Sequence, residues 1–179
     1  MKRIALSLVL LMVAVPAFAQ GTPAPMSAVS TIRNLWKTNA DYIATAAAQM
    51  PESDYSYKPV STVRSFGEIL GHVAGAEYMS CAAALGETPK AEDDIEKTVK
   101  TKAGLVAALK SAAEYCGRAY SMTDADATGM TKLFGMDQPK LWALVQNATH
   151  IAEHYGNIVT YMRMKNMVPP SSQPRAGGM

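Results

Sequence analysis

Cysteine and histidine are both scarce in this 179-residue chain, which has two of the first and three of the second. Neither Cys81 nor Cys116 belongs to a C-x-x-C pair, so a redox-active dithiol is not expected. No cysteine follows the N-terminal apolar run, which argues against a lipoprotein anchor. No later stretch is long and apolar enough to span a bilayer, so we expect no stable membrane insertion. The sequence also lacks a convincing strand pattern, which argues against a β-sheet protein.

The N-terminus has the order of segments typical of a secretory signal peptide. Lys2 and Arg3 precede a run of 12 apolar and small residues, and an A-x-A cleavage site then ends at Ala19. The run is too short to cross a membrane as a helix. We therefore predict a signal peptide over residues 1–19, cleavage after Ala19, and a periplasmic or secreted protein.

Removal of this segment balances the charge of the chain. It takes away two of the 17 basic residues and leaves 15 basic and 15 acidic residues. Because a nucleic-acid-binding domain carries a basic stripe or patch, we expect no nucleic-acid partner. The remaining length of about 160 residues suits one domain with one core.

The two cysteines, Cys81 and Cys116, lie on two different expected helices. An exported protein matures in an oxidising compartment, where disulfides persist. Closing the loop between them would stabilise the fold by about 4 kcal/mol on the chain-entropy argument. We favour a disulfide over two small buried thiols, because free thiols are uncommon in exported proteins.

Apolar residues recur at three- and four-residue steps in four segments, and this spacing predicts four helices. The helices are expected at about 27–50, 65–85, 101–121 and 139–165. Ser65 and Glu68 match a capping box at the start of the second helix, and Asp137 is the expected N-cap of the fourth. Loops are expected at 87–97 and 122–138. Four helices without strands predict an all-α fold, an up-down four-helix bundle.

The composition of the chain ends sets the expected limits of this domain. Residues 20–27 are short and polar and contain proline, so we expect a disordered leader. Residues 28–168 form the expected bundle. Residues 169–179 are rich in glycine, proline and serine, which indicates a flexible C-terminal tail.

All three histidines lie on expected helices. His150 and His154 are four residues apart, so their imidazoles point to the same side of the helix and can coordinate one metal ion. Their side of the helix lies opposite its main apolar stripe and carries four other residues: Ala143, Asn147, Asn157 and Tyr161. This side is either a solvated face with two ordinary histidines or a polar groove that holds a metal. His72, alone on the second helix, would complete a three-nitrogen site with an open position, as in catalytic zinc sites.

A series of short motifs runs through the chain from about Trp36 to Ser172. They are Met50-Pro51-Glu52, Tyr57-Lys58-Pro59, Val63-Arg64-Ser65-Phe66, Glu68-Ile69-Leu70-Gly71-His72-Val73, Leu85-Gly86-Glu87, Glu114-Tyr115-Cys116, His150-Ile151-Ala152-Glu153-His154-Tyr155-Gly156-Asn157 and Tyr161-Met162-Arg163. Each motif alone is unspecific. In their order and spacing they resemble the DinB/YfiT-like superfamily.

The resemblance implies a four-helix bundle with a metal held by one histidine of the second helix and two of the fourth. The family positions match His72, His150 and His154 here. Three imidazoles suit zinc, nickel, cobalt or iron, and zinc is the default divalent metal by availability. Better-understood members resemble transferases and isomerases that use cytoplasmic thiols such as bacillithiol or mycothiol, and an exported chain departs from them in compartment. Members often form dimers, so a homodimer is one expected assembly.

Residues around the triad are expected to hold the ligand rings in place. Ligating histidines usually donate their second ring N–H to a carboxylate or carbonyl group. The candidates near the histidines are Glu68, Asn147, Glu153, Asn157 and, as a donor to bound substrate, Tyr161. The alternative is that Glu68 only completes the capping box, that Glu153 is a surface charge, and that Tyr161 is a partly buried residue at the bundle edge.

Two classes of function follow from these patterns. The first is a metal-dependent hydrolase or transferase for a small substrate, which requires the histidines to converge on a cleft. The second is a non-catalytic helical module that binds a metal or a partner. An open metal in a pocket favours the first class, and a metal ligated fully by the protein favours the second.

Overall fold

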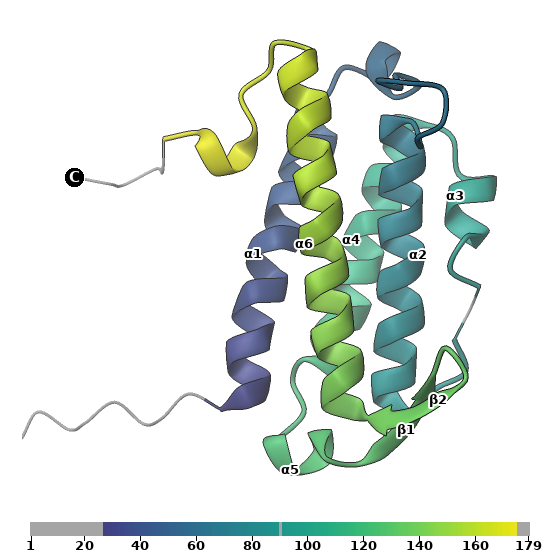
Figure 1. Cartoon of the computed structure of the whole chain (residues 1–179), viewed down its shortest axis with the longest axis vertical. Coiled ribbons are helices and arrows are strands. Elements are labelled where there is room, and N and C mark those ends of the chain that lie inside the picture. Colours follow the sequence, from purple (N-terminus) through teal and green to yellow (C-terminus); the bar gives the residue numbers. More distant parts are fainter. Residues whose placement is uncertain (1–26, 90, 175–179) are drawn as a thin grey trace, which may run out of the picture.

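The computed structural model describes residues 27–89 and 91–174, and these are mainly helical (Figure 1). Its four long helices are α1 (Ala28–Gln49), α2 (Phe66–Leu85), α4 (Lys102–Ala119) and α6 (Lys140–Met164). Helix α6 packs against α1 and α2, and α4 packs against α2 and α1. The prediction of an all-α helical bundle is confirmed. Within the described ranges, every helix is too short or too polar to cross a bilayer.

Local sequence signals account for the helix ends. The Ser27 side chain accepts a hydrogen bond from the backbone N–H of Ser30 at the start of α1. At the start of α2, Ser65 and Glu68 form both hydrogen bonds of the predicted capping box. Gly86 ends α2 with a φ of 75°, a left-handed conformation that glycine adopts without strain.

The segment expected as a loop at 122–138 contains regular structure. It holds α5 (Asp124–Ala127), β1 (Met130–Leu133) and β2 (Met136–Pro139). The antiparallel strands are joined by Phe134 and Gly135, both with positive φ, as two-residue hairpin turns require. Strands of four residues are too short to show a clear alternation, so the sequence does not indicate them. Asp137 therefore lies in β2, and Pro139 rather than Asp137 is the N-cap of α6.

The helix directions differ from the simple up-down order that was expected. Helices α2 and α4 run parallel, because Gly67 lies beside Leu105 near their N-termini and Cys81 is bonded to Cys116 near their C-termini. Helices α1 and α6 run the other way (Figure 1). The chain returns along α2 through the crossover segment 86–101.

The length of the crossover segment explains this order. Its 16 residues reach about 50 Å when extended, whereas the 20-residue helix α2 is about 30 Å long. The segment therefore spans the bundle and has room for the short helix α3 (Asp94–Thr98) on the outer side of α2 (Figure 1). Helical periodicity carries no information on direction, and the alternating order was wrong for this reason.

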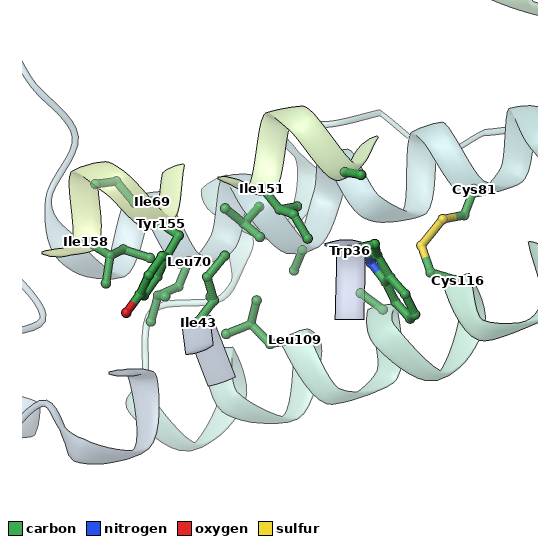
Figure 2. Packing of buried hydrophobic residues seen from close by; sticks show 14 of the residues in the cluster. Trp36, Ile43, Ile69, Leu70, Cys81, Leu109, Cys116, Ile151, Tyr155 and Ile158 are labelled. Atoms are coloured by element: carbon green, nitrogen blue, oxygen red, sulfur yellow. A yellow bond between two sulfur atoms is a disulfide. The ribbon is translucent and has the colours of Figure 1, made fainter. Parts of the chain in front are cut away.

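The core lies between the four long helices (Figure 2). All four contribute large buried side chains, among them Ile43, Leu70, Leu109, Ile151 and Ile158. Burying each such side chain contributes roughly 1.5–3 kcal/mol. Near the C-terminal ends of α2 and α4, Cys81 and Cys116 are joined by a disulfide with their Cα atoms 5.3 Å apart.

One acidic residue, Glu77, is buried in this core and is only 2% exposed. Its carboxylate accepts a hydrogen bond of 2.7 Å from Trp36 Nε1, and the Trp36 ring stacks on Tyr120 with centroids 4.4 Å apart. Burial raises the pKa of Glu77 to about 7, because the charged form loses its hydration.

The structure differs from the expected flexible tail over residues 169–174. Pro170–Ser172 form a 3-10 turn, η2, that packs against α1. The backbone N–H of Ser171 donates a hydrogen bond of 2.8 Å to the hydroxyl of Tyr155. The predicted signal peptide, nearly all of the predicted leader and the end of the tail lie outside the described residues.

Candidate metal centre

The three histidines come together between α2 and α6. His150 Nε2 lies 3.1 Å from His72 Nε2 and 3.0 Å from His154 Nε2. One ligand atom from each of the three lies within 4.8 Å of the other two. His72 and His154 are buried and His150 is half-buried. These residues form a group that can hold one metal ion.

The side of α6 that carries the histidines is interior rather than solvated. Three of the four residues expected on this side, Ala143, Asn147 and Tyr161, are buried, and the fourth, Asn157, is exposed where it lines the cleft. Helix α6 packs against two other helices, so it needs two buried sides, one of them against α2. Small and polar residues at helical spacing do not stand out as a buried stripe, which is why the sequence leaves both interpretations open.

Burial keeps these imidazoles neutral. It lowers the pKa of His72 to about 3 and that of His150 to about 4, and it lowers the pKa of His154 as well. The positive charge of Arg64 adds to the effect at His72. A neutral imidazole has one nitrogen with a free lone pair, and this is the form that binds a metal ion.

The geometry of the three rings suits a divalent cation. At the observed separations of 3.0 and 3.1 Å, facing ring nitrogens need either a ring proton between them, as in an N–H···N hydrogen bond, or a metal ion that accepts their lone pairs. In a tetrahedral site with bonds of 2.0–2.1 Å, neighbouring ligand atoms are about 3.3 Å apart, close to these values. The Nδ1 atoms of His72 and His150 are buried and lack a hydrogen-bond partner among the described residues.

One of the five residues expected around the triad contacts a histidine ring. Asn157 Nδ2 lies 3.3 Å from His154 Nδ1. When Nε2 of His154 ligates a metal, Nδ1 carries the proton, and a 180° turn of the Asn157 amide lets its oxygen accept that proton. Glu153 is exposed on the outer side of α6, as the surface-charge alternative expected.

The other three expected residues are engaged elsewhere. Glu68 accepts a hydrogen bond of 2.7 Å from the backbone N–H of Ser65, and this contact, together with the ion pair to Lys58, lowers the pKa of Glu68 to about 2. The amide of Asn147 donates to the hydroxyl of Tyr120 at 3.2 Å. The hydroxyl of Tyr161 donates to a backbone carbonyl of the loop before α2 at 2.6 Å. These side chains shape the surroundings of the site without holding a ligand ring.

Two acidic residues that the sequence reasoning missed lie against the triad. Glu92 Oε1 is 3.5 Å from His72 Nε2 and 3.9 Å from His150 Nε2. Glu96 Oε2 is 3.7 Å from His72 Nδ1. Both belong to the crossover segment, most of which was expected to be a charged loop. Their four-residue spacing, which puts two side chains on one side of a helical turn, is the signal that could have identified them.

A cleft of about 680 Å³ opens beside the triad. Its lining includes His154, Asn157, Tyr161, Lys58, Arg64 and Glu96. Arg64 Nε pairs with Glu96 Oε1 at 3.0 Å, so the cleft presents charges of both signs. This combination of an imidazole, polar groups and space suits a small polar ligand.

Known proteins of the same fold share this architecture. A DinB-like protein from Bacillus cereus is 16% identical, with a TM-score of 0.66 over 78% of this chain and 93% of that chain. A DinB-like protein from Bacillus subtilis is 19% identical, with a TM-score of 0.55 over 82% of this chain and 99% of that chain. A mycothiol-dependent maleylpyruvate isomerase is 13% identical, with a TM-score of 0.56 over 87% of this chain and 85% of that chain.

At these identities the structural likenesses show the fold alone. No curated protein is significantly similar to this chain in sequence. The sequence profile of the DinB superfamily matches residues 35–158, a span that contains all three histidines and more than half of the chain. This chain therefore belongs to the DinB superfamily.

Proposed function

We propose that the histidine triad binds one divalent metal ion, and that the protein is a metal-dependent hydrolase or transferase for a small substrate. The observation that carries the proposal is the convergence of three neutral imidazoles, 3.0 and 3.1 Å apart at Nε2, next to the cleft. A bound divalent metal polarises a substrate carbonyl or lowers the pKa of bound water. Zinc is the metal we expect, since three nitrogen donors suit it and it is readily available.

The chain's own residues would have three tasks in this site. His72, His150 and His154 hold the metal. Their burial lowers the pKa of each ring, so protons do not compete with the metal for the ring nitrogens at neutral pH. Asn157 fixes the ring orientation of His154. Arg64, exposed at the rim of the cleft, offers a guanidinium that can turn from Glu96 to an anionic group of the substrate.

Export of the protein is part of the same proposal. Its support is the signal-peptide pattern that ends at Ala19, together with the bond between Cys81 and Cys116. A cytoplasmic thiol cosubstrate would then be out of reach, so we propose a hydrolytic or transfer reaction without one. Cell fractionation and the intact mass of the exported protein test this, with Gln20 expected as the first residue.

A non-catalytic metal-binding module is the second candidate, and one observation favours it. The carboxylate of Glu92 lies 3.5 Å from His72 Nε2, at a distance from which it could close a tetrahedral site. A closed site would bind metal firmly and leave no position for substrate, whereas a five- or six-coordinate metal would keep one or two positions open.

The first experiment is the metal content of the protein purified without a histidine tag. Elemental analysis should find about one divalent ion per chain, as a three-histidine site implies. His72→Ala, His150→Ala and His154→Ala should each lose the ion while retaining helical circular dichroism, because the core lies elsewhere. Glu153→Gln, an exposed change on the same turn of α6, is the matched control and should retain the ion.

The outcome decides between the proposal and its rejection. One ion per chain, lost in all three histidine variants, would justify a screen of small esters, amides and phosphoesters with that metal loaded. Retention of the ion in all three variants, or its absence from the wild-type protein after divalent ions are added, would overturn the proposed site.

A further inference from the structure

The crossover segment passes directly over the histidine triad. It begins after α2 and returns along the outer side of α2 (Figure 1). Two of its carboxylates, those of Glu92 and Glu96, lie 3.5 and 3.7 Å from nitrogen atoms of the His72 ring. Glu92 Oε1 faces Nε2 of His72 and of His150, two of the three nitrogens that converge in the triad. Glu96 faces the opposite nitrogen, Nδ1 of His72, and also pairs with Arg64. The two carboxylates therefore occupy different positions relative to a bound ion.

Two glycines on α2, Gly71 and Gly75, allow the backbone of the crossover segment to approach α2 closely. A side-chain methyl group at Gly75 would overlap the backbone carbonyl of Glu92. One at Gly71 would lie 2.7 Å from Cα of Glu96. Glycine is less favourable than alanine inside a helix, so its presence at both positions, four residues apart, needs a packing reason. The reason here is the close approach of the backbone that carries the two carboxylates.

The separations around Glu92 match those of a metal coordination shell. Ligand atoms of a tetrahedral ion with bonds near 2.0 Å lie about 3.3 Å apart. Four of the six separations among the Nε2 atoms of the triad and Oε1 of Glu92 are 3.0, 3.1, 3.5 and 3.9 Å, which bracket that value. A carboxylate oxygen is also a normal zinc ligand, and its charge would offset part of the charge of a buried dication.

We infer that Glu92 is a fourth protein ligand, so that the site binds its metal through three imidazoles and one carboxylate carried by the crossover segment. The inference rests on the proposed metal site, because it requires the triad to bind a metal. With Glu92 as a fourth ligand, a five- or six-coordinate ion keeps a position open for substrate, whereas a tetrahedral ion would favour the non-catalytic module. Glu96 lies on the other side of His72, 3.7 Å from its Nδ1, and pairs with Arg64, so it is not one of the inferred ligands. Metal binding would then tie the crossover segment to α2 and α6.

The test compares metal affinity and coordination in Glu92→Gln with the wild-type protein. Zinc affinity is measured by competition with a chromophoric chelator, and the visible spectrum of the Co²⁺-loaded protein reports the number and kind of ligands. Glu92→Gln should still bind one ion through the histidines, with affinity lower by roughly tenfold or more and a changed Co²⁺ spectrum. Asp93→Asn is the matched control, because Asp93 pairs with Lys97 on the same segment.

A second variant tests the inference through the backbone. Gly75→Ala should displace Glu92 and reproduce the loss of affinity and the spectral change of Glu92→Gln. Gly117→Ala, a helical glycine whose Cβ would meet nothing within 4 Å, is its control. Circular dichroism checks that each glycine variant is folded. If Gly75→Ala is not folded, the comparison of Glu92→Gln with wild type decides the test.

The outcomes separate this inference from the proposed function. Suppose that Glu92→Gln has wild-type affinity and an unchanged Co²⁺ spectrum, while His72→Ala binds no metal. This result would reject Glu92 as a ligand and keep the three-histidine site. A wild-type protein that binds no metal would overturn both.

Discussion

Replacement of Glu77 by glutamine should stabilise the protein at alkaline pH and have a smaller effect in acid. Glu77 is buried with its carboxylate against Trp36 Nε1, and burial raises its pKa from 4.5 to about 7. The raised pKa means that the native state holds the proton more tightly than the unfolded chain does. The contribution of Glu77 to stability is therefore greatest below pH 4.5 and is lost as the pH rises through 7.

The size of the effect follows from the two pKa values. A shift of one pKa unit corresponds to about 1.4 kcal/mol. The titration of Glu77 therefore lowers the unfolding free energy by about 3 kcal/mol at pH 8, and by about 1 kcal/mol at pH 5, relative to strongly acidic pH. Glutamine keeps an oxygen that can accept from Trp36 but never ionises. The stability difference between Glu77→Gln and wild type should therefore grow by about 2 kcal/mol from pH 5 to pH 8. Any constant effect of exchanging hydroxyl for amide cancels in this comparison.

Urea denaturation of the oxidised proteins at several pH values, followed by circular dichroism, measures this difference. Glu114→Gln, a change of the same chemistry on the exposed side of α4, is the matched control for the substitution itself. A Glu77→Gln protein whose difference from wild type stays constant between pH 5 and pH 8 would refute the reasoning, because it would mean that Glu77 titrates normally in the folded state.

Four further predictions concern the disulfide, a helix cap, the histidines and zinc. The native protein should gain the mass of two hydrogen atoms on reduction and lose about 4 kcal/mol of unfolding free energy, and free thiols at Cys81 and Cys116 in the native protein would contradict this. Ser65→Ala should lower the unfolding free energy by about 1 kcal/mol through loss of the cap on α2, and equal urea midpoints would exclude that role. The metal-free protein should lose stability as the pH falls below 6.5, because unfolded histidines take up protons that buried His72 and His150 resist. Zinc at a hundred times its Kd should restore about 2.7 kcal/mol in thermal denaturation at neutral pH, and an unchanged melting temperature would argue against the site.

The parts of the structure that could be predicted are those set by neighbours in the sequence. The capping box of Ser65 and Glu68 and the stop at Gly86 need only residues within one helical turn, and both are present. The four long helices follow from apolar residues at helical spacing in the same way. The pairing of His150 with His154 also follows from a four-residue step along one helix.

The parts that could not be predicted depend on contacts between distant segments. The parallel order of α2 and α4 is set by the path of the crossover segment. That path produces no periodic pattern of apolar residues, so the sequence does not predict it. Glu92 and Glu96 appear within a run of charged residues, and only packing against Gly75 and Gly71 gives them a place beside His72. The short hairpin before α6 was missed because its strands are four residues long.

The sequence by itself therefore determined the helices, their caps and, through a family resemblance, the three histidines, because these depend on local spacing and on motif order. Only the tertiary structure decided that the histidine side of α6 is interior, that a cleft opens beside it, and that two carboxylates from the crossover segment meet His72. The physical reason is that burial and electrostatics at this site come from residues 20 to 80 positions apart, whose proximity exists only once the bundle has closed around them.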